Sequence, residues 1–285
     1  MNIIRIDDPA DPRVAPYLDI RERDLVGREG RFVAEGKVVL NVLFSAGRFE
    51  AESVLVLENR LAGMAETLGL APDTMPVYVA SGTVMDAISG FHMHRGILAI
   101  GRKGSAASVD EVLAALPERA LVAVPVGISN HDNIGSIFRN AAAFGADAVL
   151  LDQTCCDPLY RKAIRVSVGA ALKVPFAVGG TAGELADALT RHGFEQLALS
   201  PAGNADIRDI RRPKRLALYL GTEGEGLPEP LLKRLTTARI RMAPGFDSLN
   251  VAAASAIALH HFTEASDEPT RRAPASVAPG PDRQG

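Results

Sequence analysis

The second half of the chain alternates apolar runs with helical segments in a regular order. Runs typical of buried strands lie near 121–126, 147–152, 174–178, 196–200, 215–220 and 238–242. Helical patterns fill the intervals and the end, at 133–144, 159–171, 183–192, 228–236 and 250–264. Strands that are apolar on both faces and separated by helices form parallel sheets covered on both sides. The sequence therefore predicts an α/β fold built on a mainly parallel sheet.

The first third of the chain predicts a smaller α/β unit. A strand at 31–36 leads into an apolar helical stretch near 37–46, and short buried strands follow at 53–57, 76–79 and 96–100. The stretch 101–108 is rich in glycine and serine, as flexible linkers are. We expect an N-terminal unit with its linker over 1–104, a second unit over 118–265, and a tail over 266–285. This tail has almost no large apolar side chain, so we expect it to be disordered.

Composition limits the classes of protein that this chain can represent. With 285 residues, it exceeds one typical domain, so two domains are the first expectation. Hydrophobic residues make up 47% of the chain and charged residues 23%, which is typical of a soluble globular protein. No apolar run approaches the roughly 20 residues of a transmembrane helix. The N-terminus lacks the apolar core of a secretory signal, so we expect a cytoplasmic protein without a membrane partner.

Residue types that bind metals do not cluster in the sequence. The only two cysteines, Cys155 and Cys156, are adjacent, which fits neither a disulfide framework nor a zinc knuckle. We interpret them as structural thiols. His92 and His94 can share a strand face, but no carboxylate or cysteine cluster accompanies them. A turn before the strand at 96–100 explains these histidines better, so we predict no metal site.

The charge distribution allows a local basic patch but not a uniformly basic surface. The net charge of −3 argues against indiscriminate coating of nucleic acid, because attraction to phosphates dominates such binding. Two groups of basic residues occur, Arg161, Lys162 and Arg165 in the first, and Arg208, Arg211, Arg212, Lys214 and Arg215 in the second. The loop at 208–215 is a candidate rail for phosphates, and an ordinary solvated surface is the alternative.

Three motifs begin where predicted strands end, which is the edge of a parallel sheet at which ligands bind. The first motif spans 130–145 and follows the strand that ends at Val126. It places Asn133 at a helix start, where this residue either caps the helix or has a functional role. It also places Arg139 among apolar neighbours in the sequence. A permanent charge in such surroundings must be paired or must face a ligand.

The second motif is a glycine loop directly after the strand at 215–220. Gly221, Gly224 and Gly226 allow close backbone approach, which a bound cofactor needs and a plain turn also tolerates. The loop has neither the Lys-Ser or Lys-Thr of a phosphate-binding loop nor the first-strand position of a dinucleotide fingerprint. Glu223 in this loop either pairs with Arg139 or is an exposed loop charge.

The third motif precedes the last predicted helix. Ser248 or Asn250 either caps this helix or contributes to a site. The helix itself is rich in alanine and serine. Small side chains allow close helix approach, which suits tight packing within the chain or an interface between subunits.

Together, the three motifs resemble the signature of the SpoU family of RNA 2′-O-ribose methyltransferases, in the SPOUT superfamily. The order and spacing agree, and the matching residues are Asn133, Gly135, Arg139, Phe144, Gly145, Gly221, Glu223, Gly224, Glu225, Gly226, Met242, Ser248, Leu249, Asn250 and Val251. His131 departs from the usual proline, and Arg241 and Pro244 depart from the usual proline and glycine. These differences concern loop shape and substrate contacts more than the reaction.

The resemblance implies a fold, a cofactor and partners. It implies the SPOUT fold, in which the C-terminal segment passes through a loop as a trefoil knot that binds S-adenosylmethionine through backbone groups. Gly221, Ile240 and Leu249 inherit this cofactor-binding role, and Ser200 is a further candidate. Family members are homodimers whose active site draws on both subunits. The N-terminal unit is similar to the RNA-binding domain, related to ribosomal proteins, that is attached to many SpoU enzymes.

The resemblance also implies methyl transfer to a ribose 2′-hydroxyl, which only RNA has, so DNA is excluded as a substrate. The catalytic set becomes Arg139, Asn133, Glu223, Ser248 and Asn250. Family accounts often make the arginine a general base. Because the pKa of arginine exceeds about 12, we prefer a role for Arg139 in holding a phosphate and stabilising charge near the hydroxyl. Glu223 and Asn133 would then orient Arg139, while Ser248 and Asn250 would shape the pocket.

Alternatives to this function remain within and outside the family. The attached N-terminal unit favours ribosomal RNA over transfer RNA as the substrate. A SpoU-like protein that binds RNA without turnover is one rival, although the motif residues are intact. A Rossmann-type methyltransferase acting on a small molecule is another. That class would need its glycine loop after the first strand, whereas here the glycines follow the fifth predicted strand.

Overall fold

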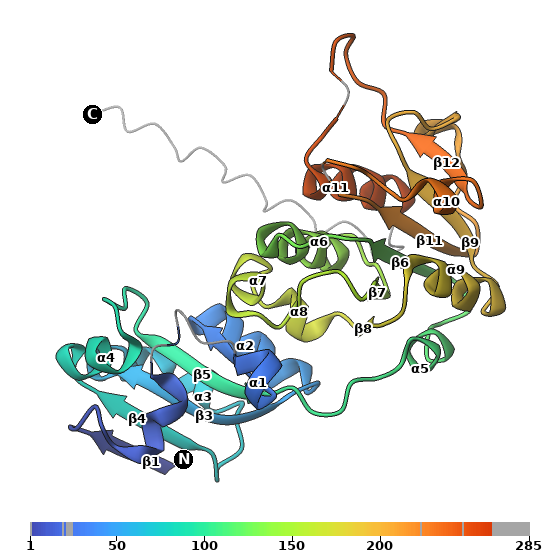
Figure 1. Cartoon of the computed structure of the whole chain (residues 1–285). Coiled ribbons are helices and arrows are strands. Elements are labelled where there is room, and N and C mark those ends of the chain that lie inside the picture. The colour runs from blue at the N-terminus through green and yellow to red at the C-terminus, as the bar shows by residue number, and fades with distance from the viewer. Residues whose placement is uncertain (1, 19, 21–24, 223, 247, 264–285) are drawn as a thin grey trace, which may run out of the picture.

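The computed structural model describes residues 2–18, 20, 25–222, 224–246 and 248–263 (Figure 1). Within these residues, the chain forms a five-stranded sheet followed by a seven-stranded sheet. The tail at 266–285, for which the sequence predicts disorder, lies outside the described residues.

The N-terminal sheet is mixed, with the order β1-β4-β3-β5-β2. β3 pairs in parallel with β4 and antiparallel with β5, which also pairs antiparallel with β2. The strands are β1 (Asn2–Ile6), β2 (Arg31–Glu35), β3 (Glu50–Leu57), β4 (Pro76–Ala80) and β5 (Ile97–Arg102). The helices are α1 (Leu25–Glu29), α2 (Lys37–Ala46), α3 (Ala65–Leu68) and α4 (Gly82–Ser89), with 3-10 turns at Pro12–Tyr17 and Glu58–Met64. The strand β1 carries no clear sequence pattern and was not predicted.

The C-terminal sheet confirms the predicted mainly parallel arrangement. Its order is β10-β12-β9-β11-β6-β7-β8, and every described pairing between these strands is parallel. The strands are β6 (Ala120–Pro125), β7 (Ala148–Leu151), β8 (Phe176–Val178), β9 (Glu195–Leu199), β10 (Ala205–Asp206), β11 (Arg215–Leu220) and β12 (Thr236–Arg239). The helices are α5 (Val109–Ala114), α6 (His131–Ala143), α7 (Arg161–Val166), α8 (Ala170–Lys173), α9 (Ala182–Arg191), α10 (Glu229–Leu232) and α11 (Val251–Phe262), with a 3-10 turn at Ile207–Asp209.

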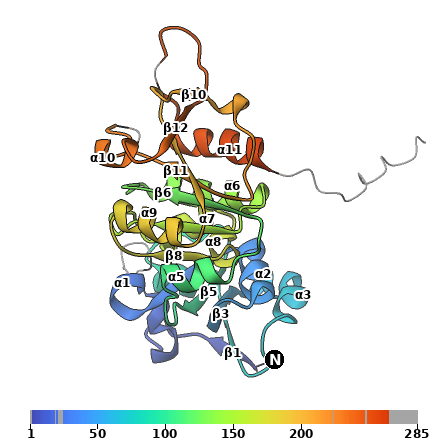
Figure 2. The same ribbon diagram turned by 90° about the vertical axis from the view of Figure 1, so that its right-hand side faces the viewer.

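Helices cover both faces of this sheet because successive strand residues point to opposite sides. On β6, Leu121 and Ala123 join the core beneath α6 and α11, whereas Val122 and Val124 join the core beneath α5 and α9. Figure 2 shows α9 and α10 on one side of the sheet and α6 and α11 on the other. The continuous apolar runs in the sequence therefore reflect strands that are buried on two faces.

The predicted helix at 159–171 is divided into α7 and α8. The break occurs at Val168 and Gly169, whose φ values are +53° and +85°. A side chain at Gly169 would meet Val42 of α2 at 3.1 Å. The packing of α2 against this turn explains the break, which the local sequence pattern did not predict.

The two sheets are joined through packed side chains and ion pairs. Ile164 and Leu172 of α7 and α8 belong to the same buried cluster as Leu40 of α2. Across the junction, the Arg161 Nη2 atom lies 2.8 Å from Glu35 Oε2, and Lys103 Nζ lies 2.6 Å from Asp157 Oδ2.

No helix in the described part of the chain is both long and apolar enough to cross a membrane.

Candidate functional site

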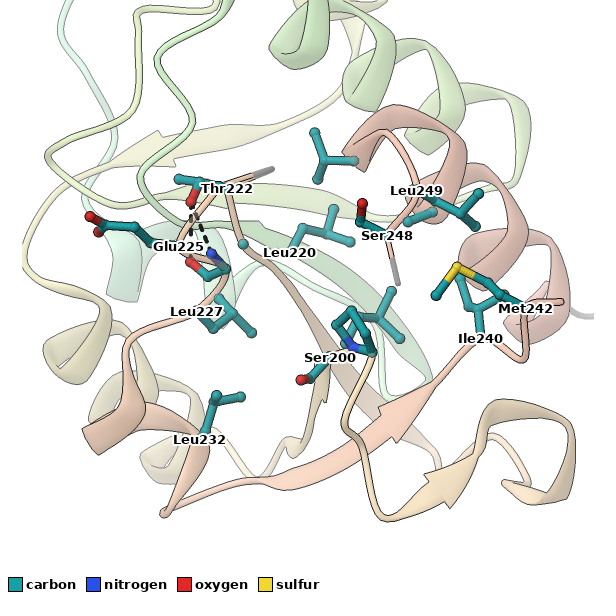
Figure 3. A pocket seen from close by; sticks show the side chains of 17 residues that line it. Ser200, Leu220, Thr222, Glu225, Leu227, Leu232, Ile240, Met242, Ser248 and Leu249 are labelled. Atoms are coloured by element: carbon teal, nitrogen blue, oxygen red, sulfur yellow. Dashed lines mark hydrogen bonds between the residues drawn. The ribbon is translucent and has the colours of Figure 1, made fainter. Parts of the chain in front are cut away.

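A pocket of about 350 Å³ lies where three neighbouring parallel strands end. Segments that follow β9, β11 and β12 line it, and the chain leading into α11 completes the wall (Figure 3). Most of the lining is apolar and consists of Leu199, Pro201, Leu220, Leu227, Leu232, Ile240, Met242, Leu249, Val251 and Ala254. Ser200, Thr222, Glu225 and Ser248 add polar side chains. The arrangement suits a small molecule with an apolar body and a few polar groups.

The four residues predicted for cofactor binding meet in this pocket. Ser200 follows β9, Gly221 follows β11, Ile240 follows β12, and Leu249 precedes α11. These residues are far apart in the sequence, and only the order of the strands brings them together. Ser248, predicted as a catalytic residue, lines the same pocket.

The glycine loop after β11 closes on itself. Thr222 and Gly226 form two backbone hydrogen bonds of 3.3 and 3.2 Å, and the Gly226 N–H also lies 3.1 Å from Thr222 Oγ1. A Cβ atom at Gly221 would lie 2.5 Å from the backbone of Gly226 and Leu227, so this closure requires glycine. Glu223 lies outside the described residues, and its pairing with Arg139 stays a prediction.

Arg139 lies on the exposed side of α6, which corrects one expectation from the sequence. The buried side of this helix carries Ile134, Ile137, Phe138 and Ala141. Residues adjacent in the sequence are about 100° apart around a helix, so the apolar neighbours of Arg139 face away from it. Within the described residues, Arg139 forms no hydrogen bond or ion pair, and its charge is accessible to a ligand.

The first and third motifs meet through two asparagines. The Nδ2 atom of Asn250 donates a hydrogen bond to Oδ1 of Asn133 at 3.1 Å. One interpretation of the sequence made Asn133 the cap of α6, and the structure shows that it is not. The helix begins earlier, and Asn130 is its cap, accepting from the Asp132 N–H at 2.8 Å. Asn133 instead lies buried in the first turn. For the cap of α11 the sequence offered Ser248 or Asn250, and the cap is Asn250, whose Oδ1 accepts from the Ala252 N–H at 2.9 Å.

Sequence reasoning missed several residues at this site. Thr222 and Glu225 line the pocket from the glycine loop, and their position in that loop could have identified them as pocket residues. Leu232 lines the pocket from the short helix α10, and no sequence pattern pointed to it. Asn140 also escaped notice. Its Nδ2 donates to the backbone oxygen of Ala252 and to Ser255 Oγ, each at 2.8 Å, and so holds α11 against α6.

Intrachain contacts engage most of the basic loop at 208–215. Arg208 pairs with buried Asp206 at 2.8 Å, and Arg212 donates to the backbone oxygen of Phe262 at 2.9 Å. Lys214 pairs with Glu118 at 2.7 Å, and the Arg215 guanidinium lies 4.4 Å from the centre of the Phe194 ring. Pairing holds the pKa of Asp206 well below its usual range. These contacts make the loop largely a structural element, and they weaken its reading as a phosphate rail.

The surroundings of the two cysteines and of the histidine pair indicate structural roles and not catalytic ones. Burial raises the pKa of both thiols, to about 11 for Cys156, so neither is a thiolate nucleophile at neutral pH. His92 and His94 lie in the turn before β5, and His92 Nδ1 is 2.7 Å from Asp86 Oδ2. In the part of the chain that the structure describes, no group of three His, Cys, Asp or Glu side chains is placed to hold a metal ion.

The fold and the pocket define a class: an α/β protein with a ligand site at the carboxyl edge of a parallel sheet. A family model described as the SpoU rRNA Methylase family matches residues 120–260. An uncharacterized tRNA/rRNA methyltransferase of Mycobacterium tuberculosis is 38% identical over 273 residues, which cover 92% of each chain. One from Synechocystis is 26% identical and covers 91% of this chain and 93% of its own. The chain belongs to the SpoU rRNA Methylase family, a family of RNA methyltransferases.

Solved structures share this fold over both sheets. An RNA 2′-O ribose methyltransferase is 26% identical with a TM-score of 0.72, covering 90% of this chain and 97% of its own. The SpoU methyltransferase AviRb from Streptomyces viridochromogenes, in complex with the cofactor AdoMet, has a TM-score of 0.76 at 22% identity. That match covers 88% of this chain and 97% of AviRb.

Proposed function

We propose that this protein transfers a methyl group from S-adenosylmethionine to a ribose 2′-hydroxyl of RNA, with ribosomal RNA as the substrate. The observation that carries the proposal is the meeting of Ser200, Gly221, Ile240, Leu249 and Ser248 around one pocket. Membership of an RNA methyltransferase family supports it, as do relatives described as tRNA/rRNA methyltransferases. The attached N-terminal unit, spanning 1–104 with its linker, favours ribosomal RNA and would contribute RNA binding.

The pocket fits the cofactor in size and chemistry. Its volume of about 350 Å³ lies within the range of about 300–1,000 Å³ that small-molecule sites occupy. Apolar side chains such as Leu227 and Ile240 suit an adenine ring, and backbone groups at the three strand ends can hydrogen-bond its edge. The carboxylate of Glu225 offers a negative charge to a sulfonium.

The residues of the chain would align the acceptor hydroxyl, whose proton would leave to solvent water, since S-adenosylmethionine, when bound, supplies the reactive methyl carbon. The planar guanidinium of Arg139 can hold a phosphate next to the acceptor ribose with two parallel N–H donors. Arg139 does not remove the proton, because arginine side chains stay protonated in proteins. We assign the orientation of Arg139 to Glu223. Asn133 supports Asn250 and the pocket wall beside Ser248.

We also propose the trefoil knot for the C-terminal segment. The strand order places β12 beyond β9, whereas α11 packs against α6, which follows β6. The connection between β12 and α11 must therefore cross the ends of β9 and β11. Ile240, Met242 and Leu249 of this connection line the same pocket as Ser200 and Gly221, which supports such a crossing.

The proposed enzyme is a homodimer that works in the cytoplasm. Exposed apolar side chains on α11, on the loop before it and on α6 support a subunit interface. Phe246 is 76% exposed, Ile257 43% and Leu249 40%, and Ala142 and Ala143 are exposed near Arg139 on α6. A closed two-fold assembly would cover these residues and bring Arg139 near the partner subunit.

The test is methyl transfer from labelled S-adenosylmethionine to bacterial RNA separated into ribosomal and transfer fractions. We expect label in ribosomal RNA that protects the adjacent linkage from alkali, and none with Arg139→Ala protein. Label confined to transfer RNA would contradict the substrate assignment. Label that leaves the linkage sensitive to alkali would contradict the 2′-O assignment. Cofactor binding without transfer to any fraction would favour an RNA-binding protein without turnover.

A further inference from the structure

A second cavity, of about 500 Å³, lies at the junction of the two sheets and shares no lining residue with the cofactor pocket. We call it the junction cavity. Phe32 and Phe91 line it from the N-terminal unit, and Tyr160, Arg161, Lys162 and Arg165 line it from the start of α7. Its volume is within the range of sites that bury small molecules, about 300–1,000 Å³.

The described lining of the junction cavity contains three cations and no acidic side chain. Arg161 is held in place by Glu35 at 2.8 Å, and its guanidinium lies 5.1 Å from the centre of the Phe91 ring. Lys162 and Arg165 are 47% and 41% exposed, so their charges are accessible from solvent. Arg165 is 4.0 Å from Glu35, beyond hydrogen-bonding distance, and one carboxylate faces two guanidinium groups. Among the described residues at this cavity, the three cations face two carboxylates, Glu35 and Asp132, so positive charge is in excess by one.

Tyr160 adds an aromatic surface beside these cations. The ring of His131 lies against it, with centroids 4.3 Å apart and planes at 34°. Burial, followed by repulsion from Lys162, lowers the pKa of His131, which favours the neutral ring. Proteins recognise unpaired RNA bases by stacking them on aromatic side chains, while Lys and Arg contact the phosphates.

The first turn of α6 links the junction cavity to the cofactor pocket through three consecutive residues. His131 contacts Tyr160, and Asp132 pairs with Lys162 at 2.6 Å. Asn133 then accepts the hydrogen bond from Asn250, beside the pocket residues Ser248 and Leu249. The first turn of α6 therefore contacts both sites. If the acceptor ribose of an RNA strand lies at the cofactor pocket, a neighbouring part of that strand can reach the aromatic and cationic junction cavity.

We propose that the junction cavity binds one nucleotide of the substrate RNA other than the acceptor, with its base against Tyr160 and its phosphate on Lys162 and Arg165. This inference rests on the proposed function for the identity of the ligand as RNA. It adds a recognition site, by which the enzyme selects RNA that presents an unpaired nucleotide at a set distance from the acceptor.

The test combines RNA binding with crosslinking on the full chain. Tyr160→Ala should weaken binding of total ribosomal RNA about tenfold, the loss expected when one stacking ring is removed, whereas Tyr160→Phe retains binding. Lys162→Ala should weaken it several-fold and lower the salt dependence. Arg191→Ala is the matched control, since Arg191 is an exposed cation paired with Asp110 at 3.0 Å outside both cavities.

Photocrosslinking of RNA that contains 4-thiouridine should label the peptide that carries Tyr160. The melting temperature and the Kd for S-adenosylmethionine should match the parent chain in all variants, which separates recognition from folding. Unchanged RNA binding in both Tyr160→Ala and Lys162→Ala, without a crosslink at this peptide, would overturn the inference. Should Tyr160→Ala not fold, Lys162→Ala and the crosslink decide. A crosslink without methyl transfer would instead contradict the proposed function and leave this site standing.

Discussion

The exposed guanidinium of Arg139 provides a positive charge and a planar pair of donors, and a substitution can test these two properties separately. Arg139→Lys keeps the positive charge but loses the planar pair of donors. We expect kcat to fall at least about tenfold with an unchanged Kd for S-adenosylmethionine, because the side chain does not line the cofactor pocket. Steady-state methyl transfer and calorimetry measure the two quantities. Arg60→Lys, at an exposed position in the N-terminal unit, is the control. Near-normal turnover of Arg139→Lys would show that the planar pair of guanidinium donors is not needed.

Gly221 permits a prediction about the glycine loop. A Cβ atom there would meet backbone atoms of Gly226 and Leu227 at 2.5 Å, so Gly221→Ala must open the loop that forms one wall of the pocket. We expect the affinity for S-adenosylmethionine to fall about tenfold or more, together with a lower melting temperature. Gly224→Ala is the matched comparison for stability, since a Cβ there meets nothing within 4 Å. Equal melting temperatures for the two variants would argue against this account.

At the scale of elements, Asn140 connects α6 and α11 through two hydrogen bonds of 2.8 Å. Asn140→Ala removes both, and the free energy of unfolding should fall by about 1–3 kcal/mol, because the Ala252 carbonyl and Ser255 lose a donor. Urea denaturation measures this change. The exposed Asn204, whose side chain forms no hydrogen bond in the described chain, supplies the control Asn204→Ala. A loss no larger than that of the control would show that packing alone holds α11.

The elements also show how far the sequence could predict the structure. Apolar runs revealed β6, β7, β9 and β11 because these strands are buried on both faces, and strand ends pointed to the edge where the pocket lies. The sequence offered Asn133 as the cap of α6, whereas the cap is Asn130, because both asparagines are good caps and the pattern does not fix the first helical residue. It also missed β10, a strand of two residues. The break at Gly169 depends on contact with α2, far away in the sequence.

At the scale of the whole molecule, the two sheets share buried side chains and should unfold together. Leu172 of α8 is fully buried in the cluster that contains Leu40 and Val54 of the N-terminal unit. We expect Leu172→Ala to lower the free energy of unfolding by about 2–5 kcal/mol. Calorimetry should show one unfolding transition at a lower temperature, rather than two transitions of which only the first has moved. Leu70→Ala, at a position that is 54% exposed, should change stability by less than about 0.5 kcal/mol. Two separate transitions would show that the units are independent.

The position of the cofactor pocket along the chain has a consequence for synthesis. One wall forms from Leu199 to Pro201, another from Leu220 to Leu227, and the last from Ile240 to Ala254, close to the C-terminal end of the described chain. A ribosome adds residues in that order, and domains form as their segments emerge. The growing polypeptide can therefore assemble its N-terminal sheet and most of its parallel sheet before it can bind the cofactor. A product truncated before Ile240 therefore lacks one wall of the pocket and should not bind the methyl donor.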